Sequence, residues 1–161
     1  MPDDGTDQTD QTDHGGPAPR TYRTSRGRRL GDALVGWLAL AGVVPHTYLL
    51  ATRGRKSGRR RTNPVTSIDR DGRRWLVAPY GVVSWVHNAR ASGQVTLRRR
   101  WTSIDCTIRE ARPEEAGPVL KQYIGIARPT RPYFRATLDD PVQQFVAEAH
   151  RHPVFELIPI G

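Results

Sequence analysis

One short, strongly basic segment lies between two stretches with the composition of β-strands, and this arrangement constrains the fold more than any other feature. Six of the nine residues from Arg53 to Arg61 are Lys or Arg, and two of the other three are Gly. The apolar run 48–51 precedes the segment, and the β-branched run 65–68 follows it. We therefore expect a loop that joins two strands and concentrates positive charge at one corner of the molecule.

The composition of this basic loop suits the binding of an anion. Glycines let several backbone N–H groups converge on one oxyanion, and arginines grip phosphate or carboxylate oxygens bidentately. Ser57 adds a hydroxyl donor. A phosphate loop of nucleotide hydrolases is excluded, because three residues rather than four separate Gly54 and Gly58. A solvated basic hairpin, or a patch that lies on nucleic acid, remains an alternative interpretation of the charge.

Charge is segregated along the chain. The 161 residues carry a net charge of +9, which predicts an acidic ligand, nucleic acid or membrane lipid as partner. Residues 1–19 hold five Asp and no Lys or Arg, and they lack large apolar groups. We expect residues 1–25 to be a disordered tail that is first acidic and then basic. No secretory signal is visible, so a cytoplasmic location is predicted.

An apolar stretch follows the arginines of the tail. Residues 30–44 read as a helix within a segment 26–45, and this helix is too short to span a bilayer, which needs about 20 apolar residues. Packing of the helix on the domain core is the favoured interpretation, because its apolar surface extends all round. The alternative is a peripheral contact of residues 20–44 with the anionic inner face of a membrane.

Residues 46–161 read as one domain of α+β class that is mainly β. Alternating and β-branched runs predict six strands, and Asp71-Gly72 is a strong hairpin turn. A split or closed β-barrel with short flanking helices removes the sheet edges of so many strands economically. The predicted strands are Thr47–Thr52, Thr62–Asp69, Arg74–Ala78, Gln94–Arg100, Ile104–Ile108 and Val154–Ile158.

Three helix starts and one buried residue are predicted within this domain. Ser84 is expected to N-cap a helix that ends near Gly93, Pro113 to open a second helix, and Asp140 to begin a third. The single cysteine, Cys106, excludes an internal disulfide and a cysteine-built metal site, and it is expected in the core. The five histidines show no metal-ligand spacing, so no metal is predicted.

Several blocks of the sequence match a known pattern. They are Gly54-Arg55-Lys56-Ser57-Gly58, Arg61-Thr62-Asn63-Pro64, Val77-Ala78-Pro79-Tyr80-Gly81, Trp85-Val86-His87-Asn88-Ala89-Arg90 and Arg151–Leu157. In these blocks the sequence resembles the deazaflavin-dependent nitroreductase and quinone reductase family, whose fold is a split β-barrel. The resemblance runs from about Arg28 to the C-terminus and leaves only the acidic tail outside.

The resemblance implies a hydride carrier and an acceptor. The carrier is coenzyme F-420, a deazaflavin that bears a phosphate and an oligoglutamate tail, and the acceptor is a small molecule with a nitro, quinone or activated-alkene group. Trp85 and Asn88 would line the pocket from one helix face, although a core aromatic is an alternative reading of Trp85. The implied cofactor-binding residues are Arg55, Lys56, Ser57, Gly58, Arg61, Thr62, Asn63, Pro64, Val77, Ala78, Pro79, Tyr80, Trp85 and Asn88.

Catalysis in such an enzyme needs few protein groups, because the cofactor supplies the chemistry. No catalytic triad is expected. Tyr80, Tyr123 and Tyr133 are candidate proton donors or substrate contacts, each weighed against ordinary packing. The protein would be a monomer or a homodimer.

Two other functions stay open beside an oxidoreductase. A nucleic-acid-binding barrel predicts aromatic residues interleaved with the basic run, and none occurs from Arg53 to Pro64, so no nucleic-acid partner is expected. A relative on the same barrel would bind flavin mononucleotide, haem or lipid instead.

Overall fold

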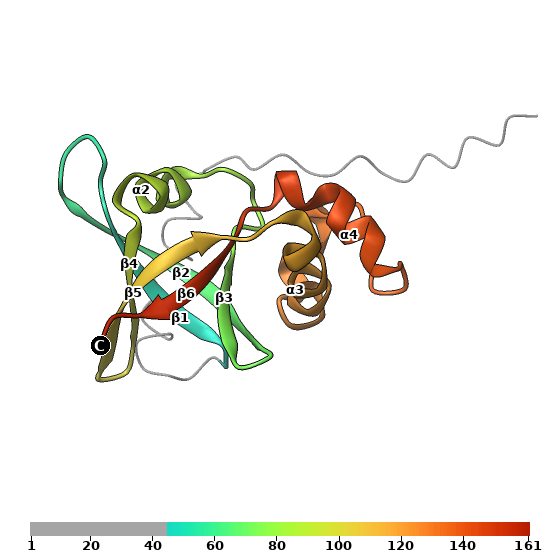
Figure 1. Ribbon diagram of the computed structural model, residues 1–161, viewed down its shortest axis with the longest axis horizontal. Helices are drawn as coiled ribbons and strands as arrows, with labels where there is room; N and C mark the ends of the chain where they lie inside the picture. The colour runs from blue at the N-terminus through green and yellow to red at the C-terminus, as the bar shows by residue number, and fades with distance from the viewer. Residues whose placement is uncertain (1–44) are drawn as a thin grey trace, which may run out of the picture.

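A computed structural model of the chain describes residues 45–161, in which six strands form one closed antiparallel barrel (Figure 1). Neighbouring strands follow the order β1-β2-β3-β6-β5-β4, and β4 pairs back onto β1. The predicted six-stranded, mainly β fold is confirmed, and every strand of the barrel has two partners. The strands are β1 (Thr47–Arg53), β2 (Arg60–Arg70), β3 (Arg73–Val77), β4 (Gln94–Arg99), β5 (Thr102–Glu110) and β6 (Val154–Pro159).

Alternation along the strands produces two apolar cores. One set of side chains fills the barrel and packs on α2 (Ser84–Ser92), and it includes Cys106, which is buried as predicted. The other set faces outward from β2 and β3 and packs beneath the remaining helices. β3 is buried on both faces, with Leu76 in the first core and Trp75 in the second, which explains its continuous apolar run.

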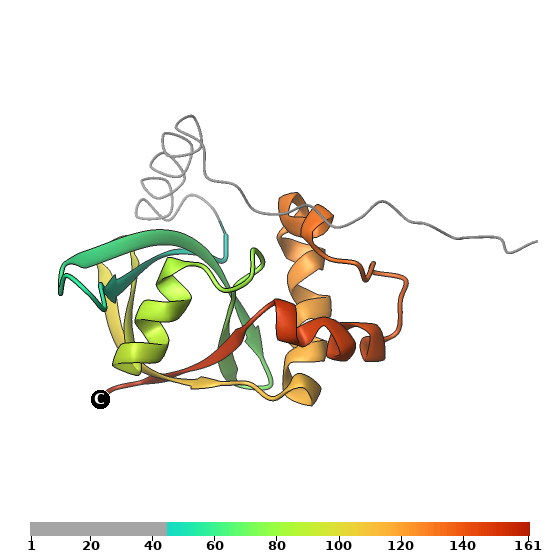
Figure 2. The ribbon, with the colours of Figure 1, turned by 90° about the horizontal axis from the view of Figure 1, so that it is seen from above.

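The helices divide between two sides of the barrel. α2 lies against β1 and β4, whereas α3 (Pro113–Ile126) and α4 (Val142–Glu148) stand together beside β2, β3 and β6 (Figures 1 and 2). Two short 3-10 segments, η1 (Arg128–Tyr133) and η2 (Ala149–Arg151), complete this side. Within residues 45–161, no helix has the length and apolar character needed to cross a membrane. The predicted tail and N-terminal helix lie outside the described residues.

Two helix starts differ from the sequence prediction. Ser84 is the first residue of α2, and the N-cap is Val83, which makes no side-chain cap. α4 begins at Val142 with Pro141 as its N-cap. The Asp140 carboxylate instead accepts hydrogen bonds from the backbone N–H (2.7 Å) and hydroxyl (2.9 Å) of Thr137. Asp and Ser favour turns as well as N-caps, so residue type alone did not distinguish the two roles.

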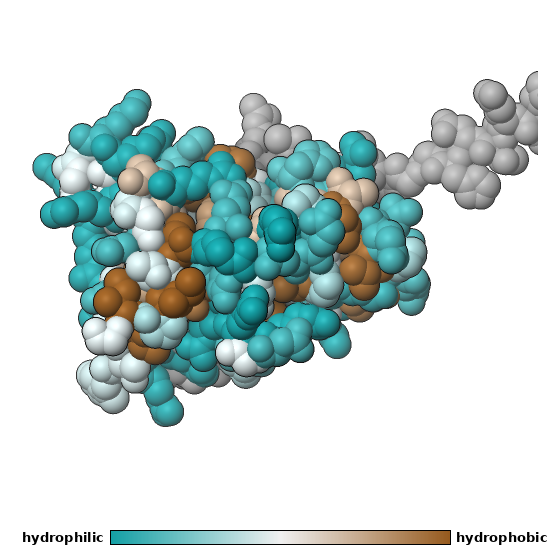
Figure 3. Space-filling model, viewed as in Figure 1, coloured by the Kyte–Doolittle hydropathy of each residue, from teal (hydrophilic) through white to brown (hydrophobic). Residues whose placement is uncertain are grey.

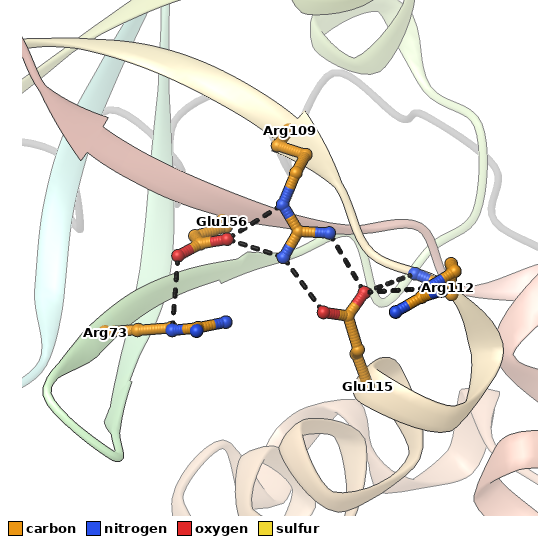
Figure 4. Close-up of polar contacts among 5 residues, drawn as sticks. All are labelled: Arg73, Arg109, Arg112, Glu115 and Glu156. Carbon is orange, nitrogen blue, oxygen red and sulfur yellow. Dashed lines mark hydrogen bonds and ion pairs between the residues drawn. The ribbon is translucent and has the colours of Figure 1, made fainter.

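A charged network joins the barrel to α3 (Figure 4). Arg109 on β5 donates from Nε to Glu156 Oε2 of β6 (2.9 Å). Its two terminal nitrogens lie 3.0 Å from the two carboxylate oxygens of Glu115 in the first turn of α3. Glu115 also accepts the backbone N–H of Arg112 at 3.1 Å, as a residue at this helix position commonly does. The Arg109 guanidinium and this N–H lower the pKa of Glu115 from 4.5 to about 2.

The depressed pKa of Glu115 predicts a defined acid sensitivity. Because the folded pKa lies below the unfolded one, the stabilisation is fully present above pH 4.5 and is lost as the pH falls toward 2. We expect Glu115→Gln to lower the melting temperature at pH 6 and to reduce the further drop between pH 5 and pH 2.5. Glu114→Gln is the matched control, since Glu114 is an exposed neighbour without an ion pair in residues 45–161. Identical melting curves of the two variants across this range would contradict the prediction.

Candidate functional site

A cavity of about 530 Å³ opens between the basic loop, the start of β2 and the first half of α2. Eight residues predicted from the sequence as cofactor-binding line it, together with Gly54 and Ser84, which were not predicted. The structure therefore brings the loop and the Trp85 helix into one site, although they are separated by two strands in sequence. The eight are Arg55, Lys56, Ser57, Arg61, Thr62, Asn63, Trp85 and Asn88.

Two glycines set the conformation of the basic loop. The N–H of Gly54 donates to the carbonyl of Arg59 (2.8 Å), and that of Gly58 donates to the carbonyl of Gly54 (2.7 Å). Gly58 has a φ of +65°, a region that favours glycine. A Cβ on Gly54 would lie 2.9 Å from Ser57 Oγ and 3.1 Å from the Arg59 carbonyl oxygen. The tight loop thus depends on glycine at both positions.

Asn88 fixes the loop from α2. Its side chain is 5% exposed, and its Oδ1 accepts the backbone N–H of Arg55 at 3.2 Å. Its Nδ2 donates to Thr52 Oγ1 at 3.3 Å. One buried amide therefore ties α2 to the loop and to the end of β1. The three-residue spacing from Trp85 placed Asn88 on the correct face of α2, but nothing in the sequence indicated these two bonds.

The start of α2 forms part of the cavity wall. Trp85 lines the cavity and also packs edge-on against Phe155 of the barrel core, at 5.9 Å between ring centroids. The two interpretations of Trp85, core aromatic and pocket wall, therefore both hold. Ser84 stands at the first helical position, where no side chain caps the helix. The free N–H groups of a helix N-terminus carry partial positive charge and favour an anion.

The charges around the cavity are available to a ligand. Arg55, Lys56 and Arg61 are exposed, and none of them makes an ion pair with any residue in 45–161. Cations that have no ion-pair partner among the described residues, together with a helix N-terminus, create a positive potential in a concave site. Such a site can hold phosphate and carboxylate oxygens.

Other predicted site residues do not line the cavity: Gly58, Pro64, Val77, Ala78, Pro79 and Tyr80. The backbone near Ala78 is engaged within the protein. The N–H of Ala78 donates to the carbonyl of Pro153 (2.9 Å), and its carbonyl accepts the N–H of Gly81 (3.1 Å). The carbonyl of Pro79 lies 2.9 Å from Nδ1 of His152. These groups therefore hold the segment after β3 against the segment before β6.

The three candidate tyrosines are likewise not part of the cavity lining. Tyr123 is 3% exposed on α3, and burial raises the pKa of its hydroxyl. Tyr80 and Tyr133 meet edge to face, with ring centroids 4.7 Å apart. Both of these are only partly buried. The structure thus places the tyrosines together on the α3 side of the barrel.

A buried polar pair near these tyrosines was missed from the sequence. His152 is 3% exposed and stacks on Phe134 at 3.9 Å between centroids. Burial lowers the pKa of His152 to about 4, so the ring is neutral at pH 7 and Nδ1 donates its proton to Pro79. Its Nε2 lies 4.0 Å from Glu148, which is 5% exposed. A lone Glu in an amphipathic helix gives no signal that it is buried.

The fold and the cavity define a six-stranded β-barrel protein with a basic cavity at one end of the barrel. A family model described as F420H(2)-dependent quinone reductase matches residues 19–139, and the chain belongs to that family. The predictions of the family, of an oxidoreductase and of coenzyme F-420 as its cofactor are therefore confirmed. A small-molecule acceptor follows from the same membership.

Solved structures support the same fold. One, described as a domain-swapped dimer, has a TM-score of 0.52 and 23% identity and covers 81% of this chain and 96% of its own. An F420-H2 dependent reductase has a TM-score of 0.50 and 23% identity, covering 70% and 94%. A protein of unknown function from Agrobacterium tumefaciens has a TM-score of 0.54 and 17% identity, covering 88% and 59%. No curated protein matches the chain significantly.

Proposed function

We propose that the cavity binds the phosphate and carboxylates of coenzyme F-420, and that the enzyme reduces a quinone or another small acceptor, a nitro compound or an activated alkene. The observation that carries this proposal is the convergence of Arg55, Lys56 and Arg61, none with an ion-pair partner in residues 45–161, on one cavity. The hydroxyl of Ser57 and the start of α2 add neutral donors to the same space.

The residues present fit the anionic part of this cofactor. A cavity of about 530 Å³ lies within the range of roughly 300–1,000 Å³ usual for small-molecule sites. Arginine forks and a lysine are the side chains that recognise phosphate and carboxylate oxygens most strongly. The flat indole of Trp85 and the polar rim of Thr62 and Asn63 supply the rest of the lining.

The bound cofactor supplies a hydride, and the protein supplies position and electrostatics. In this proposal the basic loop binds the phosphate and carboxylates of the cofactor. Asn88 fixes the position of the loop relative to α2 through its two hydrogen bonds. Tyr123 is a poor proton donor at pH 7, because burial raises the pKa of its hydroxyl. Its side chain also lies within the apolar core. Water, Tyr80 or Tyr133 would provide the proton that accompanies the hydride.

The ring contacts, the oligomeric state, the location and the membrane contact predicted from the sequence remain proposals. The segment Val77–Tyr80 would lie near the ring, and its fixed backbone supports a rigid wall there. The oligomeric state, a monomer or a homodimer, and a cytoplasmic location stay predictions. The contact of residues 20–44 with a membrane concerns a part of the chain that the structure does not describe.

Titration of the full chain with coenzyme F-420 tests the proposal. We expect saturable binding of the oxidised and reduced cofactor, followed by oxidation of the reduced form when a quinone is added. Nitroaromatic and enone acceptors, compared at equal concentration, identify the preferred class. Absence of binding for both redox forms would overturn the assignment of the cavity, and binding without turnover of any acceptor would overturn the proposed acceptor classes.

A further inference from the structure

The β4–β5 hairpin presents an unusual tip. Trp101 is fully exposed, at 101% of its reference surface, whereas Trp75 and Trp85 are 5% and 6% exposed. The preceding residue, Arg100, has a positive φ of 53°, which makes the turn tight. Large aromatic side chains are seldom left wholly in water by a folded domain, since burying one removes roughly 150–250 Å² of surface. The indole of Trp101 is therefore available to a partner.

Two arginines lie close to Trp101 in the same hairpin. Arg98 and Arg100 are exposed, and neither makes an ion pair with another residue in 45–161. Arg99 is turned differently, with its guanidinium 5.5 Å from the centroid of the Tyr48 ring. Within the described part of the chain, the hairpin thus presents two arginines without an ion pair and one exposed indole.

Apolar side chains extend this surface along the neighbouring strand. Ile158 in the last part of β6 and Ile160 just after its end are 45% and 46% exposed. Ile160 donates its N–H to the carbonyl of Asp105 on β5 (2.8 Å), so it lies a few residues from the hairpin tip. Figure 3 shows hydrophobic residues on the face near the C-terminus of the chain, and further hydrophobic residues on the side of α3 and α4.

The hairpin lies at the end of the barrel opposite to the cavity. Arg98 pairs with Leu49 near the beginning of β1, whereas the basic loop follows the end of that strand. A partner bound at the hairpin would therefore leave the cavity open. The chain outside the described residues also joins the barrel at this end, next to Thr47.

We propose that this hairpin docks the enzyme on an anionic lipid bilayer, with Trp101 at the headgroup level and Arg98 and Arg100 on the lipid phosphates. Indole rings prefer the membrane–water interface, and basic side chains near an anionic leaflet each add to binding. Exposed Ile158 and Ile160 suit a lipid boundary and have no role on nucleic acid. A single tip aromatic also differs from the successive stacking residues that single strands require. The proposal is independent of the proposed cofactor site.

Vesicle binding by the full chain tests this proposal. Large unilamellar vesicles of phosphatidylcholine, alone or with phosphatidylglycerol, are compared by co-sedimentation and by tryptophan emission. We expect partition onto the anionic vesicles with a blue shift of emission. Trp101→Ser should weaken partition about tenfold and remove most of the shift. Arg98→Gln/Arg100→Gln should weaken it about 25-fold, at roughly fivefold for each charge.

The control removes equal charge elsewhere. Arg59→Gln/Arg60→Gln lies in the basic loop, does not line the cavity, and is expected to weaken partition far less. Unchanged partition of the Trp101 and Arg98/Arg100 variants would overturn the proposal and leave any binding to the N-terminal segment. Binding of a random duplex that depends on Trp101 without binding of vesicles would also overturn it. So would self-association in the absence of lipid that Trp101→Ser abolishes.

Discussion

Replacement of Lys56 and Arg61 together by Ala is expected to weaken binding of coenzyme F-420 by at least about a hundredfold. Both side chains line the cavity, and no carboxylate in residues 45–161 neutralises them. A hydrogen bond to a charged group contributes roughly 1.5–3 kcal/mol, so the loss of two corresponds to about 3–6 kcal/mol. The fold should be unaffected, because neither side chain contributes to the barrel cores.

The same loop provides a matched control. Arg59→Ala/Arg60→Ala removes two charges from neighbouring positions that are exposed and do not line the cavity. Because screening at physiological salt limits long-range attraction to about 8 Å, this control should weaken binding only severalfold. Isothermal titration of both double variants under one salt concentration measures the difference. Equal losses in the two variants would show general attraction to a basic surface rather than a defined site.

The barrel and the half of the site built from the loop could be predicted because their signals are local. Period-two runs predict the strands, and Asp71-Gly72 predicts a hairpin turn between two of them. Closing six strands into a barrel leaves no strand edge unpaired, which favours a barrel. Charge and glycine spacing within Arg53–Arg61 identify the loop, and the spacing of Trp85 and Asn88 identifies the helix face. The cavity then follows from closure, which brings α2 against β1.

The features that the sequence did not predict depend on contacts between residues that are far apart in the sequence. Ser84 lines the cavity as the first residue of α2, whereas the N-cap pattern predicts that the helix begins one residue later. The hydrogen bond from Arg55 to Asn88 joins positions 33 residues apart, and that between His152 and Pro79 joins positions 73 apart. No local pattern reports such partners. The same limit applies to buried polar groups, since Glu148 resembles any solvent-exposed helical glutamate until the chain 135–136 is placed over it.

Glu148 is accordingly the residue whose replacement should destabilise the fold most among the polar positions described above. Its two carboxylate oxygens accept the backbone N–H groups of Arg135 (3.0 Å) and Ala136 (3.1 Å), in a side chain only 5% exposed. Glu148→Ala leaves both donors without an acceptor, at roughly 1–3 kcal/mol each. We expect the free energy of unfolding to fall by about 3 kcal/mol or more in urea denaturation.

Two further variants separate these bonds from the loss of a charge. Glu148→Gln keeps one acceptor oxygen but turns an N–H₂ group toward the second donor, so its loss should lie between those of wild type and Glu148→Ala. Glu114→Ala removes an exposed glutamate from α3 and should change stability by less than about 0.5 kcal/mol. A Glu148→Ala protein as stable as Glu114→Ala would show that the 135–136 segment finds other acceptors. In that case the buried carboxylate would not be what holds this segment against α4.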